Sequence, residues 1–171
     1  AGTRLDHLKA GYDAEVADGQ EPGQLMRQGA ATFDDLPAEQ FNIDHVVVAA
    51  EGVFAIETKG FTKPNQGRGK ADATVVYDGE TLRFPHWTTK EPLEQAERQA
   101  AWLAKWLSSA VGSPVSMLPV IALPGWFVER TGRGRVRVFS GKELAGLLKS
   151  RGTQALPAQD VQRIAHQVEQ R

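Results

Sequence analysis

The chain lacks cysteine altogether, has almost no net charge and contains no long hydrophobic run. Without cysteine there can be no disulfide partner, no thiolate zinc site and no cysteine nucleophile. No run approaches the roughly 18 apolar residues that cross a bilayer, and the first residues, Ala1 to Lys9, lack the apolar core of a signal peptide. The 20 Lys and Arg residues against 21 Asp and Glu give a net charge of −1, which excludes a strongly basic coat for nucleic acid.

The composition is that of an ordinary globular chain. Hydrophobic residues make up 41% of the 171 residues and charged residues 24%, which argues against a disordered, fibrous or membrane-spanning protein. A chain of this length buries roughly 70% of its unfolded surface, enough for a core without disulfides. Because the sequence shows neither an internal repeat nor an obvious linker, we expect one domain over residues 1–171.

Two β-branched runs, residues 42–50 and 53–59, form the strongest structural signal in the chain. They flank Glu51-Gly52, which predicts a hairpin with a two-residue loop. Both runs are apolar on both faces, so we expect the hairpin at the centre of a sheet with helices on each side. The other expected elements are an interrupted helix at 4–26, strands at 31–33, 73–77, 81–84, 115–123 and 135–139, a long helix from 92 to about 112, and helices at 142–149 and 157–170. These elements predict an α/β fold with a mixed central β-sheet flanked by helices.

The hairpin brings three ionisable side chains together. If Glu51-Gly52 is the loop, Asp44 lies opposite Lys59, and Val46 lies opposite Glu57. Side chains alternate between faces along a strand, so Asp44, Glu57 and Lys59 share one face. Cross-strand neighbours are roughly 5 Å apart, and we therefore expect these groups to converge.

Burying two carboxylates side by side is costly, and one lysine offsets only part of that cost. A divalent cation offsets more, since Mg²⁺ takes hard oxygen ligands and is commonly held by two carboxylates and a substrate phosphate. This chemistry favours phosphate-ester hydrolysis, with Lys59 orienting the water or offsetting charge on phosphorus. The spacing alone is explained as well or better by a partly exposed Glu57–Lys59 ion pair. The apolar neighbours on the same face, Val46 and Ala55 among them, weigh against that alternative.

Several ordered motifs resemble one known family. They are Ile43-Asp-His-Val-Val-Val, Gly52-Val-Phe-Ala-Ile-Glu-Thr-Lys-Gly60, Tyr77-Asp-Gly and Gln95-Ala-Glu-Arg-Gln-Ala-Ala-Trp-Leu103. The chain resembles the nuclease-related domain (NERD) family, over a core of about 11–139 followed by C-terminal helices at about 141–170. That family is placed in the PD-(D/E)xK nuclease superfamily. The resemblance implies a restriction-endonuclease-like α-β-β-β-α-β core and a DNA nuclease that depends on Mg²⁺ or Mn²⁺.

The resemblance also implies roles for particular residues. Asp44 matches the first-strand aspartate of the superfamily, and Glu57 and Lys59 match its (D/E)xK pair, so Asp44 and Glu57 would bind the metal. Ile43 stands in place of the nominal proline, a mild departure because the proline chiefly restrains the backbone. Glu15 matches the first-helix glutamate and would approach the metal or its water, although a solvated helix carboxylate explains it equally well.

The glutamine-bearing helix of the family is matched by Gln95 and Gln99. Their i, i+4 spacing places them on one stripe with Trp102 and Trp106, which could face nucleic acid. Hydrogen bonds to a neighbouring strand or to water explain the glutamines as well as a substrate contact does. For the tryptophans, packing is favoured over base stacking.

A basic loop follows the hairpin and carries Lys63, Arg68 and Lys70. These cations could track phosphates by releasing counterions, and solvated loop charge explains them equally. Arg133, Arg135 and Arg137 could extend this surface or simply decorate an exposed strand. The histidines lack partners at metal-ligand spacing, so no zinc is expected.

DNA is the expected partner, and a non-catalytic nucleic-acid-binding or sensor module of a larger protein is the alternative. Members of the resembled family are often fused to other modules, and the chain does not begin with Met. A fused or upstream domain or a membrane anchor outside this chain is therefore compatible with it. We expect the chain itself to be soluble, in the cytoplasm or at the cytoplasmic face of a membrane.

Overall fold

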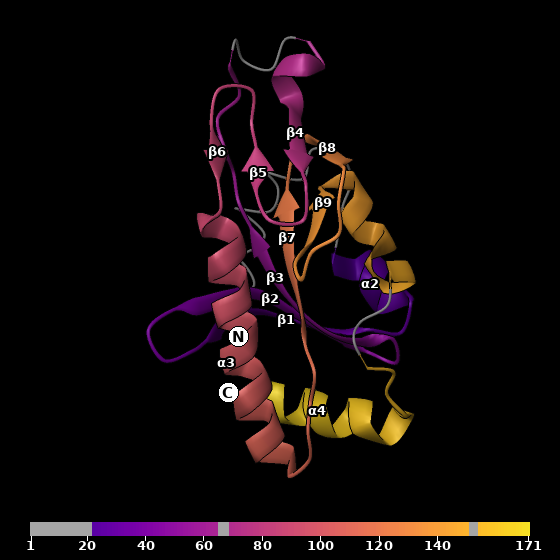
Figure 1. Ribbon diagram of the computed structural model, residues 1–171. Helices are drawn as coiled ribbons and strands as arrows, with labels where there is room; N and C mark the ends of the chain where they lie inside the picture. The colour runs from indigo at the N-terminus through magenta and orange to yellow at the C-terminus, as the bar shows by residue number, and fades with distance from the viewer. Residues whose placement is uncertain (1–21, 65–68, 151–153) are drawn as a thin grey trace.

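The protein is described here by a computed structural model that covers residues 22–64, 69–150 and 154–171 (Figure 1). Two sheets organise these residues, one with strand order β1-β2-β3-β7-β9 and one with order β6-β5-β4-β8. The expected first helix lies outside the described residues, apart from a short helix α2 (Pro22–Arg27). No helix in the described ranges combines the length and apolarity that a membrane crossing requires.

The larger sheet is mixed, as predicted. Its first three strands run antiparallel, and β3 pairs in parallel with β7, which pairs in parallel with β9. The strands are β1 (Ala31–Pro37), β2 (Asn42–Ala49), β3 (Gly52–Thr58), β7 (Leu118–Leu123) and β9 (Arg137–Ser140). The β2–β3 hairpin therefore occupies the interior of the sheet, which confirms the interpretation of its doubly apolar runs.

The predicted register of this hairpin is wrong by two residues. Ala50 and Glu51 form the turn and Gly52 already pairs with Ala49, so Val46 faces Ala55 instead of Glu57. Gly52 has φ 144°, a backbone conformation that other residues rarely adopt, and it is needed where the strand begins. Moving the turn by one residue shifts every partner by two, and an even shift leaves each side chain on its predicted face.

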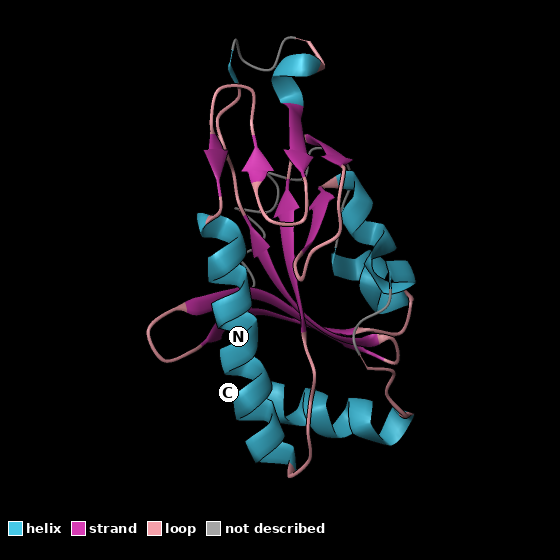
Figure 2. Ribbon diagram, viewed as in Figure 1, coloured by secondary structure: helices cyan, strands magenta, loops and turns pink. Residues whose placement is uncertain are grey.

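Helices cover both faces of this sheet (Figure 2). On one face, α3 (Glu91–Val111) and α4 (Ala158–Gln170) pack over an aliphatic surface of β2 and β3, in a cluster that includes Val46, Ala55, Leu103 and Ile164. On the other face, α2 and the 3₁₀ helix η3 (Lys142–Ser150) pack over Val47, Phe54 and Val120. The three-layer arrangement confirms the α/β class.

Helix α3 matches its predicted bounds. Pro92 lies in the first turn, where its missing N–H costs nothing, and buried apolar residues recur on one side of the helix. Gly112 ends it in the left-handed region with φ 78°, and its N–H donates to the Ser108 carbonyl at 3.0 Å. Residues 142–149, predicted as an α-helix, form the longer 3₁₀ helix η3 instead.

The second sheet is smaller and was predicted only in part. The hairpin β4 (Thr74–Tyr77) and β5 (Leu82–Arg83) is confirmed, preceded by the 3₁₀ turn η2 (Ala71–Ala73). Two short strands, β6 (Thr88–Thr89) and β8 (Phe127–Arg130), were not predicted. They complete the sheet by pairing with β5 and β4.

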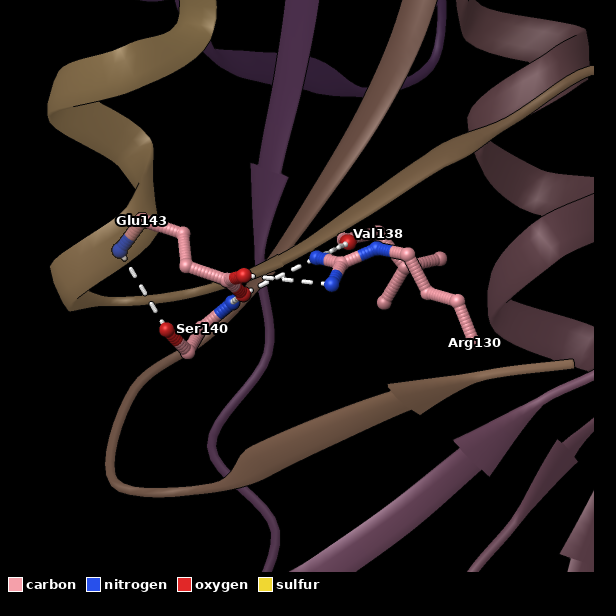
Figure 3. A network of polar contacts seen from close by, with 4 residues as sticks. All are labelled: Arg130, Val138, Ser140 and Glu143. Carbon is pink, nitrogen blue, oxygen red and sulfur yellow. Dashed lines mark hydrogen bonds and ion pairs between the residues drawn. The ribbon is translucent and has the colours of Figure 1, made fainter.

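The two sheets are tied together by a network around Glu143 (Figure 3). Arg130, at the end of β8, donates to both Glu143 oxygens, at 3.1 and 2.9 Å, and to the Val138 carbonyl of β9 at 2.6 Å. Ser140 and Glu143 exchange hydrogen bonds through the backbone N–H of each residue, the reciprocal pattern of a capping box. Strand β8, strand β9 and helix η3 thereby form one unit.

Other strand bounds differ from the sequence prediction. Strand β1 continues to Pro37, beyond the predicted strand at 31–33, because it pairs with β2 as far as Pro37. Strand β9 begins only at Arg137, so Arg133 and Arg135 lie in the preceding loop and the three arginines do not line one strand face.

Candidate active site

Two carboxylates meet where the β2–β3 ladder ends. The last paired residues are His45 and Ile56, so the next position brings Asp44 and Glu57 side by side. The Thr58 N–H donates to Asp44 Oδ2 at 2.9 Å, and the Asp44 N–H donates to Glu57 Oε1 at 3.4 Å. Each carboxylate therefore accepts a hydrogen bond from the other strand, and the predicted convergence of Asp44 and Glu57 is confirmed despite the different register.

Glu57 is buried, with 5% of its surface exposed. Burial, followed by the negative charge of Asp44, raises the pKa of Glu57 from 4.5 to about 8, while the charge of Lys59 acts in the opposite direction. A side-chain hydrogen bond with Asp44 also raises this pKa. At neutral pH Glu57 is therefore mostly protonated when no cation is bound.

Lys59 completes the predicted trio just beyond β3. Its backbone N–H donates to the Ala122 carbonyl of β7 at 3.0 Å, which fixes the residue at the end of the strand. The side chain is half-buried, and its charge is close enough to act on Glu57.

Helix α3 covers this face of the sheet and carries both predicted glutamines. Gln99 is 4% exposed, and within the described residues its Oε1 is a buried acceptor without a hydrogen-bond partner. It lies between Ala96, which packs in a cluster with Ile121, and Ala100, which packs in a cluster with Ala55. Since Ile121 is the lateral partner of Glu57 and Ala55 precedes Glu57 by two residues, Gln99 lies on the part of α3 that packs on the carboxylate face of the sheet.

Gln95 lies one turn before Gln99 and is half-buried. Trp102 and Trp106 pack against the core under α3, with their rings 6.5 Å apart and the Arg171 guanidinium over both. This confirms the packing interpretation of the tryptophans.

Two of the basic residues after the hairpin, Lys63 and Lys70, lie against the segment that leads into β8. The Lys63 ammonium lies against Gly125, where an added Cβ would meet it at 2.9 Å. Lys70 lies over the Phe127 ring at 5.2 Å and lines a cavity of about 980 Å³ on the outer side of the second sheet. Arg68 lies outside the described residues, as does Glu15.

A buried polar pair on the other face of the sheet was not predicted. His45 Nδ1 lies 3.0 Å from Asp34 Oδ1, and both side chains are largely shielded from solvent. The predicted strand ended at residue 33, so Asp34 was not expected to lie beside His45 in the sheet. His45 points away from Asp44, as strand alternation predicts, and is no candidate ligand of the same ion.

The donor set suits a hard divalent cation. Asp44 and Glu57 supply carboxylate oxygens, and the unpartnered Gln99 Oε1 offers a neutral oxygen on the same face. Within residues 22–64, 69–150 and 154–171, no group of three or more His, Cys, Asp or Glu side chains is placed to hold a metal ion. A cation here would therefore complete its coordination with Gln99, water or substrate, or with a residue outside these ranges.

Comparison with known proteins bears on this arrangement. The family model of the nuclease-related domain matches residues 11–124, about two thirds of the chain. The chain belongs to the nuclease-related domain family. Comparisons with curated proteins and with solved structures give no match.

The region matched by the NERD family contains the whole candidate site, from Asp44 to Gln99. A mixed sheet flanked by helices is consistent with the PD-(D/E)xK superfamily to which NERD domains are assigned. The match ends at residue 124, so strands β8 and β9 and helices η3 and α4 lie beyond the matched region. Membership in this family supports a nuclease-related function.

Proposed function

We propose that this NERD protein is a divalent-metal-dependent nuclease that hydrolyses DNA phosphodiester bonds. One observation carries the proposal, which is the pairing of buried Glu57 with half-buried Asp44, with the charge of Lys59 acting on Glu57. The fold keeps these carboxylates together although their repulsion and burial are unfavourable, and a cation would relieve both.

Asp44 and Glu57 would hold Mg²⁺ or Mn²⁺, with Gln99 as a further oxygen donor and Glu15 near the metal or its water. When bound, such a cation supplies Lewis-acid polarisation of a phosphoryl oxygen and a more acidic water. Binding requires Glu57 to release its proton, so metal affinity is expected to increase with pH up to about 8.

Lys59 would orient the attacking water or offset the charge that grows on phosphorus. Its backbone N–H is held by the Ala122 carbonyl of β7, and its charge already acts on Glu57. Gln95, one helical turn from Gln99, would position the water or the substrate. Lys63, Arg68 and Lys70 would contact the DNA backbone at a distance from the carboxylates.

A cutting assay tests this proposal. Labelled DNA is incubated with the wild-type protein, Glu57→Gln and Lys59→Met, with Mg²⁺, with Mn²⁺ or with EDTA. We expect metal-dependent cleavage by wild type and a loss of about 100-fold or more in each variant. Glu143→Gln, a carboxylate change far from the site, is the control and should cleave like wild type. Equal cleavage by all four proteins would reject the assignment.

Metal binding gives a second readout that does not depend on activity. Mn²⁺ should raise the unfolding midpoint of the wild-type protein, because a ligand that binds only the folded state stabilises it. Glu57→Gln should lose most of that increase. A wild-type midpoint that is unaffected by Mn²⁺ at pH 8 would contradict the metal site.

The second candidate is a non-catalytic nucleic-acid-binding or sensor module. Two observations favour it, namely the net charge of −1 and the lack of a third acidic or histidine ligand among the described residues. DNA binding without metal uptake, measured by calorimetry with Mn²⁺, would support this candidate over the nuclease.

A further inference from the structure

An exposed tryptophan, Trp87, stacks on a buried phenylalanine close to the candidate site. Trp87 is 44% exposed, although tryptophan is a residue that usually buries its area. Its ring stacks on Phe84 with centroids 4.4 Å apart and planes 10° apart, and Phe84 itself is 3% exposed. The remaining members of this aromatic cluster are Phe61 and Trp126.

Hydrogen bonds and ring contacts hold the four aromatic side chains of this cluster in place. The Phe84 N–H donates to the Trp87 carbonyl at 2.7 Å, which closes the tight turn between β5 and β6. Phe61 meets Trp87 edge-on at 5.2 Å, and its carbonyl accepts a hydrogen bond from Trp126 Nε1 at 3.2 Å. Trp126 is 2% exposed. Trp87 is therefore held at its base and edge while the rest of its ring faces solvent.

The cluster adjoins the carboxylate site through the chain. Phe61 follows Lys59 by two residues, so their Cα atoms are at most roughly 7 Å apart. Phe61 also packs against the apolar cluster that contains Ile121, the lateral partner of Glu57. The segment that leaves β3 runs beside the β5–β6 hairpin (Figure 1). Trp87 thus stands within a few nucleotides of any phosphate held at the carboxylates.

Positive charge alternates with these rings. Lys59 and Lys63 flank Phe61 in sequence, and the Lys63 ammonium lies against Gly125, next to Trp126. Cations that track a backbone beside an aromatic face form the arrangement that binds single-stranded nucleic acid without sequence preference. A paired base inside a duplex offers no free face to such a ring.

We propose that Trp87 is a stacking platform for an unpaired base of the substrate, so that the protein acts on single-stranded DNA or on the single-stranded part of a junction or end. The inference rests on the proposed nuclease function for the reaction itself. It adds the substrate class and a substrate-contacting residue on the turn between β5 and β6.

Binding in EDTA tests the platform separately from cleavage. The probe is a fluorescein-labelled oligothymidylate, followed by fluorescence anisotropy, with the full chain as wild type, Trp87→Ala and Trp87→Phe. We expect Trp87→Ala to bind about 5- to 100-fold more weakly, and Trp87→Phe, which keeps a stacking ring, to stay within about threefold of wild type. A blunt duplex should bind Trp87→Ala and wild type about equally.

Phe127 provides a matched control. It is 51% exposed, lies beside a lysine and directly follows Trp126, whereas the ring contacts of Trp87 within the described residues are with Phe61 and Phe84. Phe127→Ala should bind the single strand within about twofold of wild type if Trp87 is the platform. Loss of binding in Phe127→Ala equal to that in Trp87→Ala would overturn the assignment, as would unchanged binding by Trp87→Ala or no binding by wild type.

The two proposals fail in different ways. Trp87-dependent binding by a wild-type protein that never cleaves with Mg²⁺ or Mn²⁺ would remove the nuclease and leave the platform. Metal-dependent cleavage of single strands that Trp87→Ala performs with unchanged KM would remove the platform and leave the nuclease.

Discussion

Replacing Glu57 by glutamine removes a carboxyl group whose ionised form destabilises the metal-free fold. The pKa of Glu57 rises from 4.5 to about 8 on folding, because burial and then the charge of Asp44 disfavour its ionised form. The folded protein therefore keeps a proton that the unfolded chain releases above pH 4.5. Stability from this group is fully present below pH 4.5 and is lost as the pH rises to about 8.

The size of the effect follows from the two pKa values. A pKa difference of about 3.5 corresponds to about 5 kcal/mol at high pH, of which about 3 kcal/mol has been lost at pH 7. Glutamine carries no charge and keeps an oxygen that can accept the Asp44 N–H. We expect Glu57→Gln to be more stable than wild type by about 1–3 kcal/mol at pH 7, after allowance for relaxation around the site.

Urea unfolding in EDTA at several pH values between 4 and 9 measures the difference in free energy of unfolding between Glu57→Gln and wild type. The wild-type free energy of unfolding should fall between pH 5 and 8, and the curve for Glu57→Gln should lie above it with a smaller slope. The two proteins should converge near pH 4, where wild-type Glu57 is protonated in both states. A wild-type curve that is flat from pH 5 to 8, or a variant that is less stable at pH 8, would refute the reasoning.

Three further predictions concern other parts of the fold. Gly79→Ala should cost about 2–4 kcal/mol in urea unfolding, since φ is 98° and an added Cβ would meet a backbone oxygen at 2.3 Å, whereas Gly112→Ala, with φ 78° and open space, should cost about 1 kcal/mol. Gln99→Met should stabilise the metal-free protein by about 1 kcal/mol by removing an unpartnered buried oxygen, and an unchanged or lower midpoint would contradict this. Burial raises the pKa of Glu143, but hydrogen bonds and charge from Arg130 outweigh burial and lower this pKa overall. The stability that the Arg130–Glu143 pair contributes is therefore present above pH 4.5 and is lost as the pH falls. Arg130→Met should therefore raise this pKa in an NMR titration, with a stability loss of up to about 1 kcal/mol because both side chains are partly exposed.

The central hairpin was predictable because its signal is local and redundant. Two long β-branched runs specify strands at almost any register, and alternation fixes the faces of Asp44 and Glu57 whichever even shift the turn adopts. The turn itself was misplaced because Gly52 suggested a glycine at its centre, while the fold uses that glycine at the start of β3.

The second sheet was harder to predict because its pairing is non-local. Strand β8 contributes only Phe127–Arg130 and gains its partner β4 from about fifty residues earlier in the chain. Strand β6 has only Thr88–Thr89, too short for any periodicity. The exposure of Trp87 depends on this sheet, so no sequence pattern could have separated it from the packed tryptophans of α3.

Within the site, the shared face of the trio followed from alternation, but its electrostatics did not. The backbone hydrogen bonds to Asp44 and Glu57 depend on the true register, and the unpartnered oxygen of Gln99 depends on how α3 lies across the sheet. The contacts of Lys63 with Gly125 and of Lys70 with Phe127 depend on the route of the chain into the second sheet, which composition does not encode.

Asp44 makes the shorter of the two hydrogen bonds that join the strands at the carboxylates, 2.9 Å against 3.4 Å for Glu57. Its Oδ2 accepts the Thr58 amide where the regular ladder has ended, so this carboxylate substitutes for a missing strand carbonyl. A family member that had abandoned catalysis would still gain from an aspartate at this position, and a glutamate there would overshoot the amide by one methylene. The buried glutamate accepts only the longer hydrogen bond, from the Asp44 N–H, and its ionised form is unfavourable in the fold unless a cation accompanies it. The residue at the Glu57 position, more than the residue at the Asp44 position, should therefore distinguish catalytic members of the family from members that have lost catalysis.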